Sequence, residues 1–183
     1  MKTLVLLAAS IFTFTIANAQ QASSTAQQTV QLSLSNVLEI TFLGTGNANG
    51  ATVSLPFTSV NDYANGVTSS AQQLRVRTNK NFSVTVQANA ANFTYAGTAN
   101  PSPAMPVSGV LAIKVPANAT GGSIAAPFSS TGYSTLTNTP QNLINNGTNG
   151  DSQTFDIQYN ATPGFAYPGG TYTVDVVYTA TQL

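Results

Sequence analysis

Apolar and polar residues alternate with a period of two along most of this chain. Successive side chains of a β-strand point to opposite faces, so this alternation predicts strands with one apolar and one polar face. The predicted strands cover residues 30–34, 38–42, 53–57, 74–77, 82–87, 111–115, 155–159 and 172–180. A helix is expected only at residues 59–64, and there for a turn or two at most.

Charged residues identify which face of these strands meets water. Removal of a leader that contains Lys2 would leave nine charged side chains, and six of them occupy the polar phase of the alternation. These six are Glu39, Arg75, Arg77, Lys114, Asp156 and Asp175. Burial of an unpaired charge is costly, so we interpret the polar phase as the solvent face of antiparallel strands.

Turn signals separate the strands. Asn-Gly pairs such as Asn49-Gly50 and Asn65-Gly66 tolerate positive φ, and residues 79–81 are expected to form a tight hairpin. Residues 116–150 have few apolar anchors and are expected to form loops with one or two short edge strands. Many strands with short connections predict an all-β fold, an antiparallel two-sheet β-sandwich of immunoglobulin-like or jelly-roll type.

The N-terminus has the pattern of a signal peptide. Lys2 precedes an apolar run over residues 4–16, and Ala17-Asn18-Ala19 is a small-x-small cleavage site. We therefore expect a signal peptide at residues 1–19, a flexible arm at residues 20–28 and one sandwich domain at residues 29–183. Cleavage near Ala19 predicts a secreted, surface or periplasmic protein without a transmembrane segment.

Composition narrows the range of partners. Only 5% of the residues are charged, whereas 42% are hydrophobic. Four cations in the mature chain cannot form a surface that neutralises phosphates, so nucleic acid and anionic lipid are poor partners. Neutral polar residues must supply the solubility.

The chain lacks the side chains of most catalytic and metal sites. It contains no His, Cys or Trp, which excludes imidazole-based triads, thiolate nucleophiles and zinc sites with nitrogen or sulfur ligands. Asp156 and Asp175 could lie on neighbouring strands, but we expect them to be separate solvated acids. We therefore predict no enzyme and no cofactor. The oxygen-rich turn at residues 145–151 carries a single carboxylate, which favours a plain turn over a calcium site.

Aromatic residues in loops are the remaining candidates for ligand contact. Phe165 and Tyr167 lie between Pro163 and Pro168, and their rings could stack on sugars or plug an end of the core. The same two alternatives hold for Tyr63, Phe128 and Tyr133.

The last fifteen residues begin with Gly169-Gly170-Thr171-Tyr172 and continue as a long alternating strand. This ending resembles the final strand of chaperone–usher pilins and of the related spore coat protein U group, which are secreted bacterial β-sandwich proteins. The resemblance implies a location at the bacterial cell surface or periplasm and a subunit that adds strands between chains. It implies that the alternating segment near the N-terminus, with Val30, Leu32 and Leu34, is the donor in strand exchange. The matching residues of the final strand are Gly170, Tyr172, Val174 and Val176.

Two functional hypotheses follow. The first is a non-catalytic structural or adhesive surface protein that binds itself or other surface proteins, with strand addition as one route of assembly. The alternative is a carbohydrate- or peptidoglycan-binding module that uses Phe165 and Tyr167.

Overall fold

The computed structural model describes residues 22–183. The chain divides into two units, Met1–Leu34 and Ser35–Leu183. The predicted signal peptide at residues 1–19 and its cleavage site lie outside the described residues, as do residues 20 and 21 of the predicted arm.

Residues 22–34 of the first unit form neither helix nor strand, although the sequence predicts a strand at residues 30–34. The side chains of Val30, Leu32 and Leu34 are 79%, 82% and 89% exposed. Alternation determines which side chains would share a face, but a strand also needs a neighbour for its N–H and C=O groups. The compact second unit begins at Ser35, six residues after the start of the predicted domain at residues 29–183.

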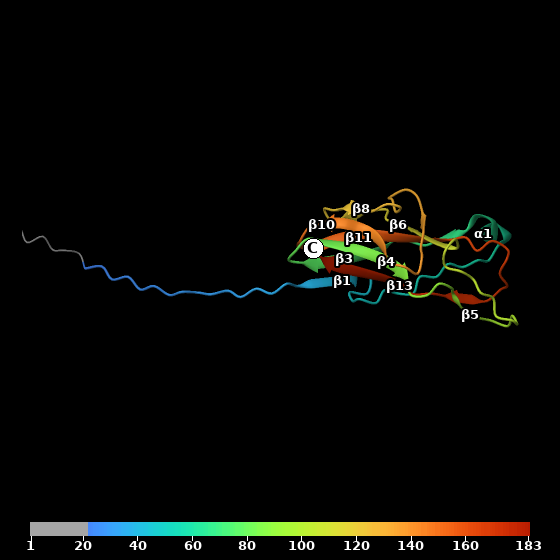
Figure 1. Ribbon diagram of the computed structural model, residues 1–183, viewed down its shortest axis with the longest axis horizontal. Coiled ribbons are helices and arrows are strands. Elements are labelled where there is room, and N and C mark those ends of the chain that lie inside the picture. Colours follow the sequence, from blue (N-terminus) through green and yellow to red (C-terminus); the bar gives the residue numbers. More distant parts are fainter. Residues whose placement is uncertain (1–21) are drawn as a thin grey trace, which may run out of the picture. The chain divides into compact units, whose positions relative to one another are not determined.

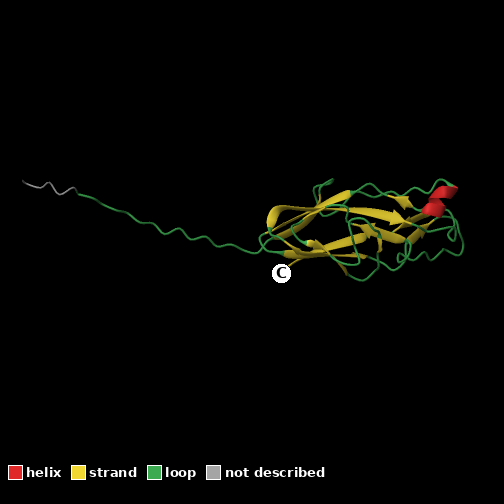
Figure 2. Ribbon diagram, turned by 90° about the horizontal axis from the view of Figure 1, so that it is seen from above, coloured by secondary structure: helices red, strands yellow, loops and turns green. Residues whose placement is uncertain are grey.

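The second unit is an antiparallel β-sandwich, as the sequence predicts (Figures 1 and 2). Its larger sheet has the order β1 (Leu38–Phe42), β3 (Gln72–Thr78), β11 (Gly150–Ala161), β6 (Leu111–Lys114) and β9 (Ser134–Thr135), and β11 also pairs with β2 (Val67–Thr68) and β7 (Asn118–Ala119). The smaller sheet has the order β13 (Val176–Gln182), β4 (Phe82–Ala88), β10 (Gln141–Gly147) and β8 (Ser123–Ile124). A separate ribbon pairs β5 (Thr94–Ala96) with β12 (Thr171–Thr173).

The hydrophobic core joins the apolar phases of both sheets into one cluster. Its fully buried side chains include Leu74 and Val76 of β3, Phe82 of β4 and Phe155 of β11. The six charged residues on the polar phase are all at least partly exposed, so the predicted solvent face is confirmed. Thr41 is an exception to the alternation, because this polar-phase residue of β1 is buried.

Residues 79–81 do not form the predicted hairpin. β3 pairs with β1 and β11, whereas β4 pairs with β10 and β13, so this short turn carries the chain from one sheet to the other. Periodicity shows that two strands flank a turn, but it does not show whether they pair. Both sandwich crossings and hairpins use short Asn-rich turns.

The expectation of loops and edge strands at residues 116–150 is wrong for β10, which lies inside the smaller sheet between β4 and β8. Leu143 and Ile144 are adjacent and both buried. The register against β4 shifts between Asn142 and Ile144, and such a β-bulge turns consecutive side chains to one side. The bulge therefore conceals the alternation in the sequence.

The side chains of residues 51–57 alternate between the core and solvent as in a strand, but the segment is not hydrogen-bonded to a neighbouring strand. Val53, Leu55 and Phe57 pack against the core, while the side chains between them are exposed. Within the described part of the chain, no strand pairs with this segment. The apolar alternation at residues 53–57 therefore reports burial, and not a strand.

The predicted final strand is divided in two. β12 pairs with β5 and β13 pairs with β4, and Val174 and Asp175 lie between them. At the division, Asn89 Nδ2 donates to Asp175 Oδ2 at 2.9 Å and Asp175 N donates to Asn89 Oδ1 at 3.1 Å. Asn89 N also donates to the Asp175 carbonyl at 2.9 Å, so the Asn89 side chain replaces only the backbone acceptor for Asp175 N.

The single short helix in residues 22–183, α1 (Val60–Asn65), confirms the predicted helical turn. α1 and the β5–β12 ribbon lie at one end of the sandwich, and the C-terminus lies at the opposite end (Figure 1). The former end also carries the loop at residues 162–170.

Candidate functional site

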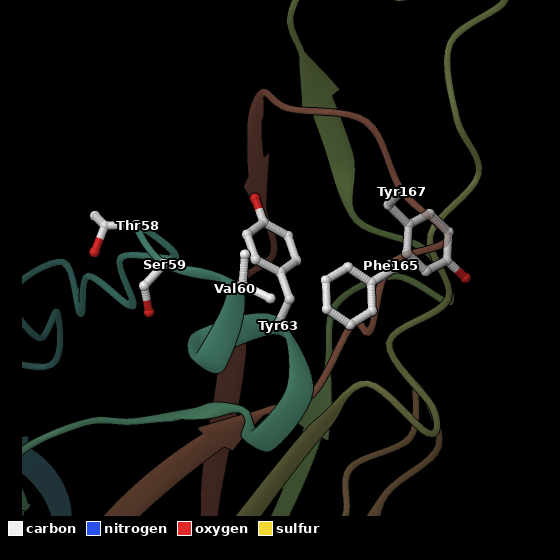
Figure 3. A pocket seen from close by; sticks show the side chains of 6 residues that line it. All are labelled: Thr58, Ser59, Val60, Tyr63, Phe165 and Tyr167. Atoms are coloured by element: carbon white, nitrogen blue, oxygen red, sulfur yellow. The ribbon is translucent and has the colours of Figure 1, made fainter.

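A shallow depression lies at the end of the sandwich that carries α1 (Figure 3). Its volume is about 330 Å³, and it is lined by Thr58, Ser59, Val60, Tyr63, Phe165 and Tyr167. The lining joins α1 and the segment before it to the loop at residues 162–170. These two segments are far apart in the sequence.

The start of α1 is held by a capping box. Ser59 Oγ accepts a hydrogen bond from Asp62 N at 3.3 Å, and Asp62 Oδ2 accepts from Ser59 N at 2.7 Å. Asp62 Oδ2 also accepts from Thr58 N at 2.8 Å. This reciprocal arrangement fixes the first turn of α1 and with it the position of Tyr63, the residue after Asp62.

The same contacts lower the pKa of Asp62 below 3.8, and the hydrogen bond from Thr58 N is the largest cause. A lowered carboxyl pKa stabilises the folded state above the pKa of the unfolded chain. The contribution is lost as the pH falls through the lower folded value. The cap is therefore complete at neutral pH.

The loop at residues 162–170 is anchored by two tyrosine hydroxyls from the ribbon. Tyr172 Oη donates to the carbonyl of Pro168 at 2.9 Å, and Tyr95 Oη donates to the carbonyl of Gly169 at 3.1 Å. Gly170 lies against the Tyr95 ring, where a Cβ atom would overlap the ring. Burial raises the pKa of Tyr172, and the nearby Tyr95 and Tyr167 act in the same direction. The Tyr172 hydroxyl therefore keeps its donor proton throughout the neutral range.

Aromatic rings from both segments meet in the depression. The rings of Tyr63 and Phe165 are stacked, with centroids 5.7 Å apart and an interplanar angle of 24°. Phe57 lies behind Tyr63 at 5.4 Å, and Tyr167 meets the edge of Tyr172 at 6.4 Å. Phe165 nevertheless remains 67% exposed.

The structure separates the aromatic candidates from one another. Phe165 and Tyr167 line the depression together with Tyr63. Phe128 is buried in the core, and Tyr133 lies under the Lys114 ammonium, 4.7 Å from the ring centroid. Nothing in the local pattern indicates that Thr58 and Val60 line a site, but the Ser59–Asp62 spacing of a capping box could have indicated where Tyr63 lies.

The strand-exchange candidates lie in three places. Val30, Leu32 and Leu34 belong to the unpaired segment of the first unit. Gly170 precedes β12, which contains Tyr172, and Val176 begins β13. Val174 lies between the two strands, so these residues do not form the single continuous strand that the resemblance implies.

The acidic residues considered for catalysis do not converge. Asp156 lies on β11 of the larger sheet and accepts a hydrogen bond from Gln73 Nε2 at 2.8 Å. Asp175 precedes β13 of the smaller sheet and is bonded to Asn89. Residues 22–183 contain no cluster of three or more His, Cys, Asp or Glu side chains that could hold a metal ion.

Comparison with known proteins adds no family. No protein-family model matches this chain, and a search of curated proteins finds no similar sequence. In the described residues, no helix has the length and apolar character needed to span a membrane.

Proposed function

We propose that this protein is an exported, non-catalytic structural or adhesive protein of the bacterial cell surface that assembles by strand addition between copies. The observation that carries the proposal is the exposure of Val30, Leu32 and Leu34. Three large apolar side chains at alternate positions form the face of a strand that lacks a neighbour. Each would lose contact with water if the segment joined a sheet, with a gain of about 1.5–3 kcal/mol for complete burial.

An acceptor for such a segment needs a free strand edge. In the described part of the chain, β13 pairs with β4 and β1 pairs with β3, so each forms an edge of its sheet. Natural edge strands are usually protected by charges, especially Lys. β13 is seven residues long and carries no charged residue, whereas Glu39 on β1 is paired with Arg77. These features favour β13 as the acceptor.

Composition supports a non-catalytic role and close packing of copies. The sequence has no His or Cys to serve as a base or nucleophile, and the nine charges of the mature chain, four cations and five carboxylates, nearly cancel. Neutral surfaces repel one another little when they approach. The predicted signal peptide and the resemblance of the C-terminus to pilin-like sandwiches support export to the bacterial surface.

Assembly is tested by sedimentation of the mature chain over a range of concentrations. We expect oligomers that grow with concentration, and we expect the triple variant Val30→Ser/Leu32→Ser/Leu34→Ser to stay monomeric. The control variant Gln31→Ala/Ser33→Ala changes the opposite face of the same segment and should assemble like the parent chain. A parent chain that is monomeric at every concentration would contradict the proposal.

The acceptor edge is tested by disulfide trapping, which is simple in a chain without cysteine. Ser33→Cys and Thr179→Cys change polar-phase residues of the donor segment and of β13. If the two segments pair, a mixture of the two variants should yield cross-linked dimers. Val177→Cys and Thr181→Cys, used in place of Thr179→Cys, scan the register. A disulfide forms only where the two Cα atoms lie about 4.4–6.8 Å apart. Cross-linking to Glu39→Cys on β1 alone would exclude β13 as the acceptor.

The carbohydrate- or peptidoglycan-binding alternative concerns a different part of the molecule, the aromatic depression at the α1 end. A specific observation favours it, namely the exposed ring of Phe165. The two proposals are compatible because they use different residues.

A further inference from the structure

The ring of Phe165 lies at the surface, where a ligand could contact it, and does not fill the end of the core. One face of the ring stacks on Tyr63, yet the side chain is 67% exposed and lies outside the hydrophobic core cluster. Phe57, by contrast, packs against that cluster. Val60, another lining residue of the depression, is also 73% exposed. An exposed aromatic and aliphatic patch in a hollow marks a surface for a ligand or a partner.

Residues with neutral hydroxyl groups also line the depression, namely Thr58, Ser59, Tyr63 and Tyr167. Tyr63 and Tyr167 are lining residues, and within residues 22–183 their hydroxyls make no hydrogen bond like the one that ties Tyr172 to Pro168. Ser59 Oγ accepts from Asp62 N, and its hydroxyl also bonds to the Asp62 carboxylate, so Ser59 belongs to the cap and not to the free groups of the lining. A ligand in the depression would therefore meet a ring face together with several neutral donors and acceptors.

The depression also lacks a charge that could select an ion. No Lys, Arg, Asp or Glu is among its lining residues. The carboxylate of Asp62, which lies between the lining residues Ser59 and Tyr63 in the sequence, accepts hydrogen bonds from Thr58 and Ser59. The lining therefore offers no cation to an anionic ligand, and the one neighbouring carboxylate is already engaged by the cap. A complementary ligand is uncharged, with one apolar face and many hydroxyl groups.

We infer that the aromatic depression binds a neutral pyranose unit of a glycan, whose C–H face stacks on the exposed ring of Phe165 while its hydroxyl groups bond to neutral polar groups of the lining. The volume of about 330 Å³ is at the low end of the range for small-molecule sites, about 300–1,000 Å³. This volume suits one or two sugar units. The inference does not depend on assembly by strand addition.

The site is preorganised on both sides. The capping box holds α1 and Tyr63, and the hydroxyls of Tyr172 and Tyr95 hold the loop that carries Phe165. Rigid presentation lowers the ordering cost of binding. The depression is nevertheless open, so a single site should bind weakly, with a Kd on the order of 1 mM. An assembly that presents many copies would convert this weak binding into avidity.

The inference is tested by NMR or calorimetric titration of the mature chain with neutral oligosaccharides, namely cellotriose, maltotriose and tri-N-acetylchitotriose. We expect at least one of them to bind, with perturbations confined to the depression. Phe165→Ala should weaken binding about tenfold or more, since it removes the stacking surface. Tyr63→Phe keeps the ring and loses a hydroxyl, so its effect should be smaller. Leu43→Ala changes an exposed apolar residue outside the depression and should bind like the parent.

Each titration is repeated in the triple variant Val30→Ser/Leu32→Ser/Leu34→Ser, which we expect to be monomeric. Retained single-site binding there supports the glycan site whatever the result for assembly. The inference is overturned if the parent binds none of the three sugars, if Phe165→Ala binds equally well while thermal unfolding shows it folded, or if choline or an aromatic peptide binds in the depression and the sugars do not.

Discussion

Two short segments of this chain share one pattern and differ in structure. Residues 30–34 read Val-Gln-Leu-Ser-Leu, and residues 38–42 read Leu-Glu-Ile-Thr-Phe. The second segment forms β1, in register with β3 from Leu38↔Thr78 to Phe42↔Leu74. The first forms no strand, and its three apolar side chains are exposed. Alternation therefore specifies an apolar face that can be buried. Whether that face is buried depends on the presence of a neighbouring strand.

The anchor of β1 explains where the compact unit starts. Val37 N donates to Asn79 Oδ1 at 3.0 Å, and Asn79 Nδ2 donates to the carbonyl of Ser35 at 2.9 Å. Gln182 Nε2 reaches the carbonyl of Val37 at 2.8 Å. These side chains bond to the backbone just before β1. The segment at residues 30–34 precedes the anchor and lacks equivalent partners in the described structure.

The largest contrast is expected from truncating the last apolar residue of each segment. The Phe42 ring packs edge-on against Tyr178, with centroids 6.0 Å apart, so Phe42→Ala should lower the free energy of unfolding by about 3 kcal/mol. Leu34→Ala should change it by less than about 0.5 kcal/mol, because Leu34 is exposed. Urea unfolding at a concentration where the chain is monomeric measures both. Equal losses would show that residues 30–34 are already packed in the monomer.

A second effect concerns the buried tyrosine pair behind Phe42. Tyr159 Oη and Tyr178 Oη are 2.9 Å apart. Burial raises the pKa of Tyr159 to about 12, partly opposed by the bond to Tyr178, and burial also raises the pKa of Tyr178. The folded state therefore holds these protons more tightly than the unfolded chain does. The resulting stability is complete below pH 10 and decreases as the pH rises toward 12, by roughly 2–3 kcal/mol for Tyr159.

The double variant Tyr159→Phe/Tyr178→Phe should flatten this alkaline decline in urea unfolding between pH 9 and pH 12, values that bracket the ordinary and raised tyrosine pKa. Each single variant leaves one hydroxyl without its partner and should cost about 1–3 kcal/mol at neutral pH. Tyr133→Phe, outside the pair, serves as the control. An unchanged alkaline slope in the double variant would assign the decline to other groups.

The smallest effect is expected from the ion pair across β1 and β3. Arg77 Nε donates to Glu39 Oε2 at 2.6 Å, and both side chains are about half exposed. Solvent-exposed pairs contribute about 0.2–1 kcal/mol. Glu39→Gln should therefore lower stability by no more than that at low ionic strength, and the difference should vanish at about 1 M salt because the Debye length falls to about 3 Å. A loss that persists in high salt would indicate that Glu39 holds β1 by a different interaction.

Much of the fold could be predicted because period-two patterns report burial directly. The patterns around Leu74, Phe82, Ile113 and Phe155 all correspond to strands with buried apolar phases. What they could not show is pairing, as the crossing at residues 79–81 and the unpaired segment at residues 51–57 demonstrate. β10 was missed because its bulge places Leu143 and Ile144 on the same side.

The candidate site was predictable in part. Flanking prolines placed Phe165 and Tyr167 on a loop, and both line the depression. The stacking of Tyr63 on Phe165 depends on the tertiary approach of α1 to that loop, which local pattern does not encode. The contrast between buried Phe128 and exposed Phe165 likewise depends on which loop covers the core.

The division of the last strand at Asn89 and Asp175 has a mechanical consequence. The loop with Phe165 leads through β12 directly into β13, whose seven residues from Val176↔Ala88 to Gln182↔Phe82 are in register with β4. Hydrogen bonds of an antiparallel pair run perpendicular to the strands. A pull on the loop along the direction of β13 therefore loads the whole ladder in shear at once, and does not open it one bond at a time from the end. Tension applied at the aromatic tip would be resisted by the full length of the strand pair.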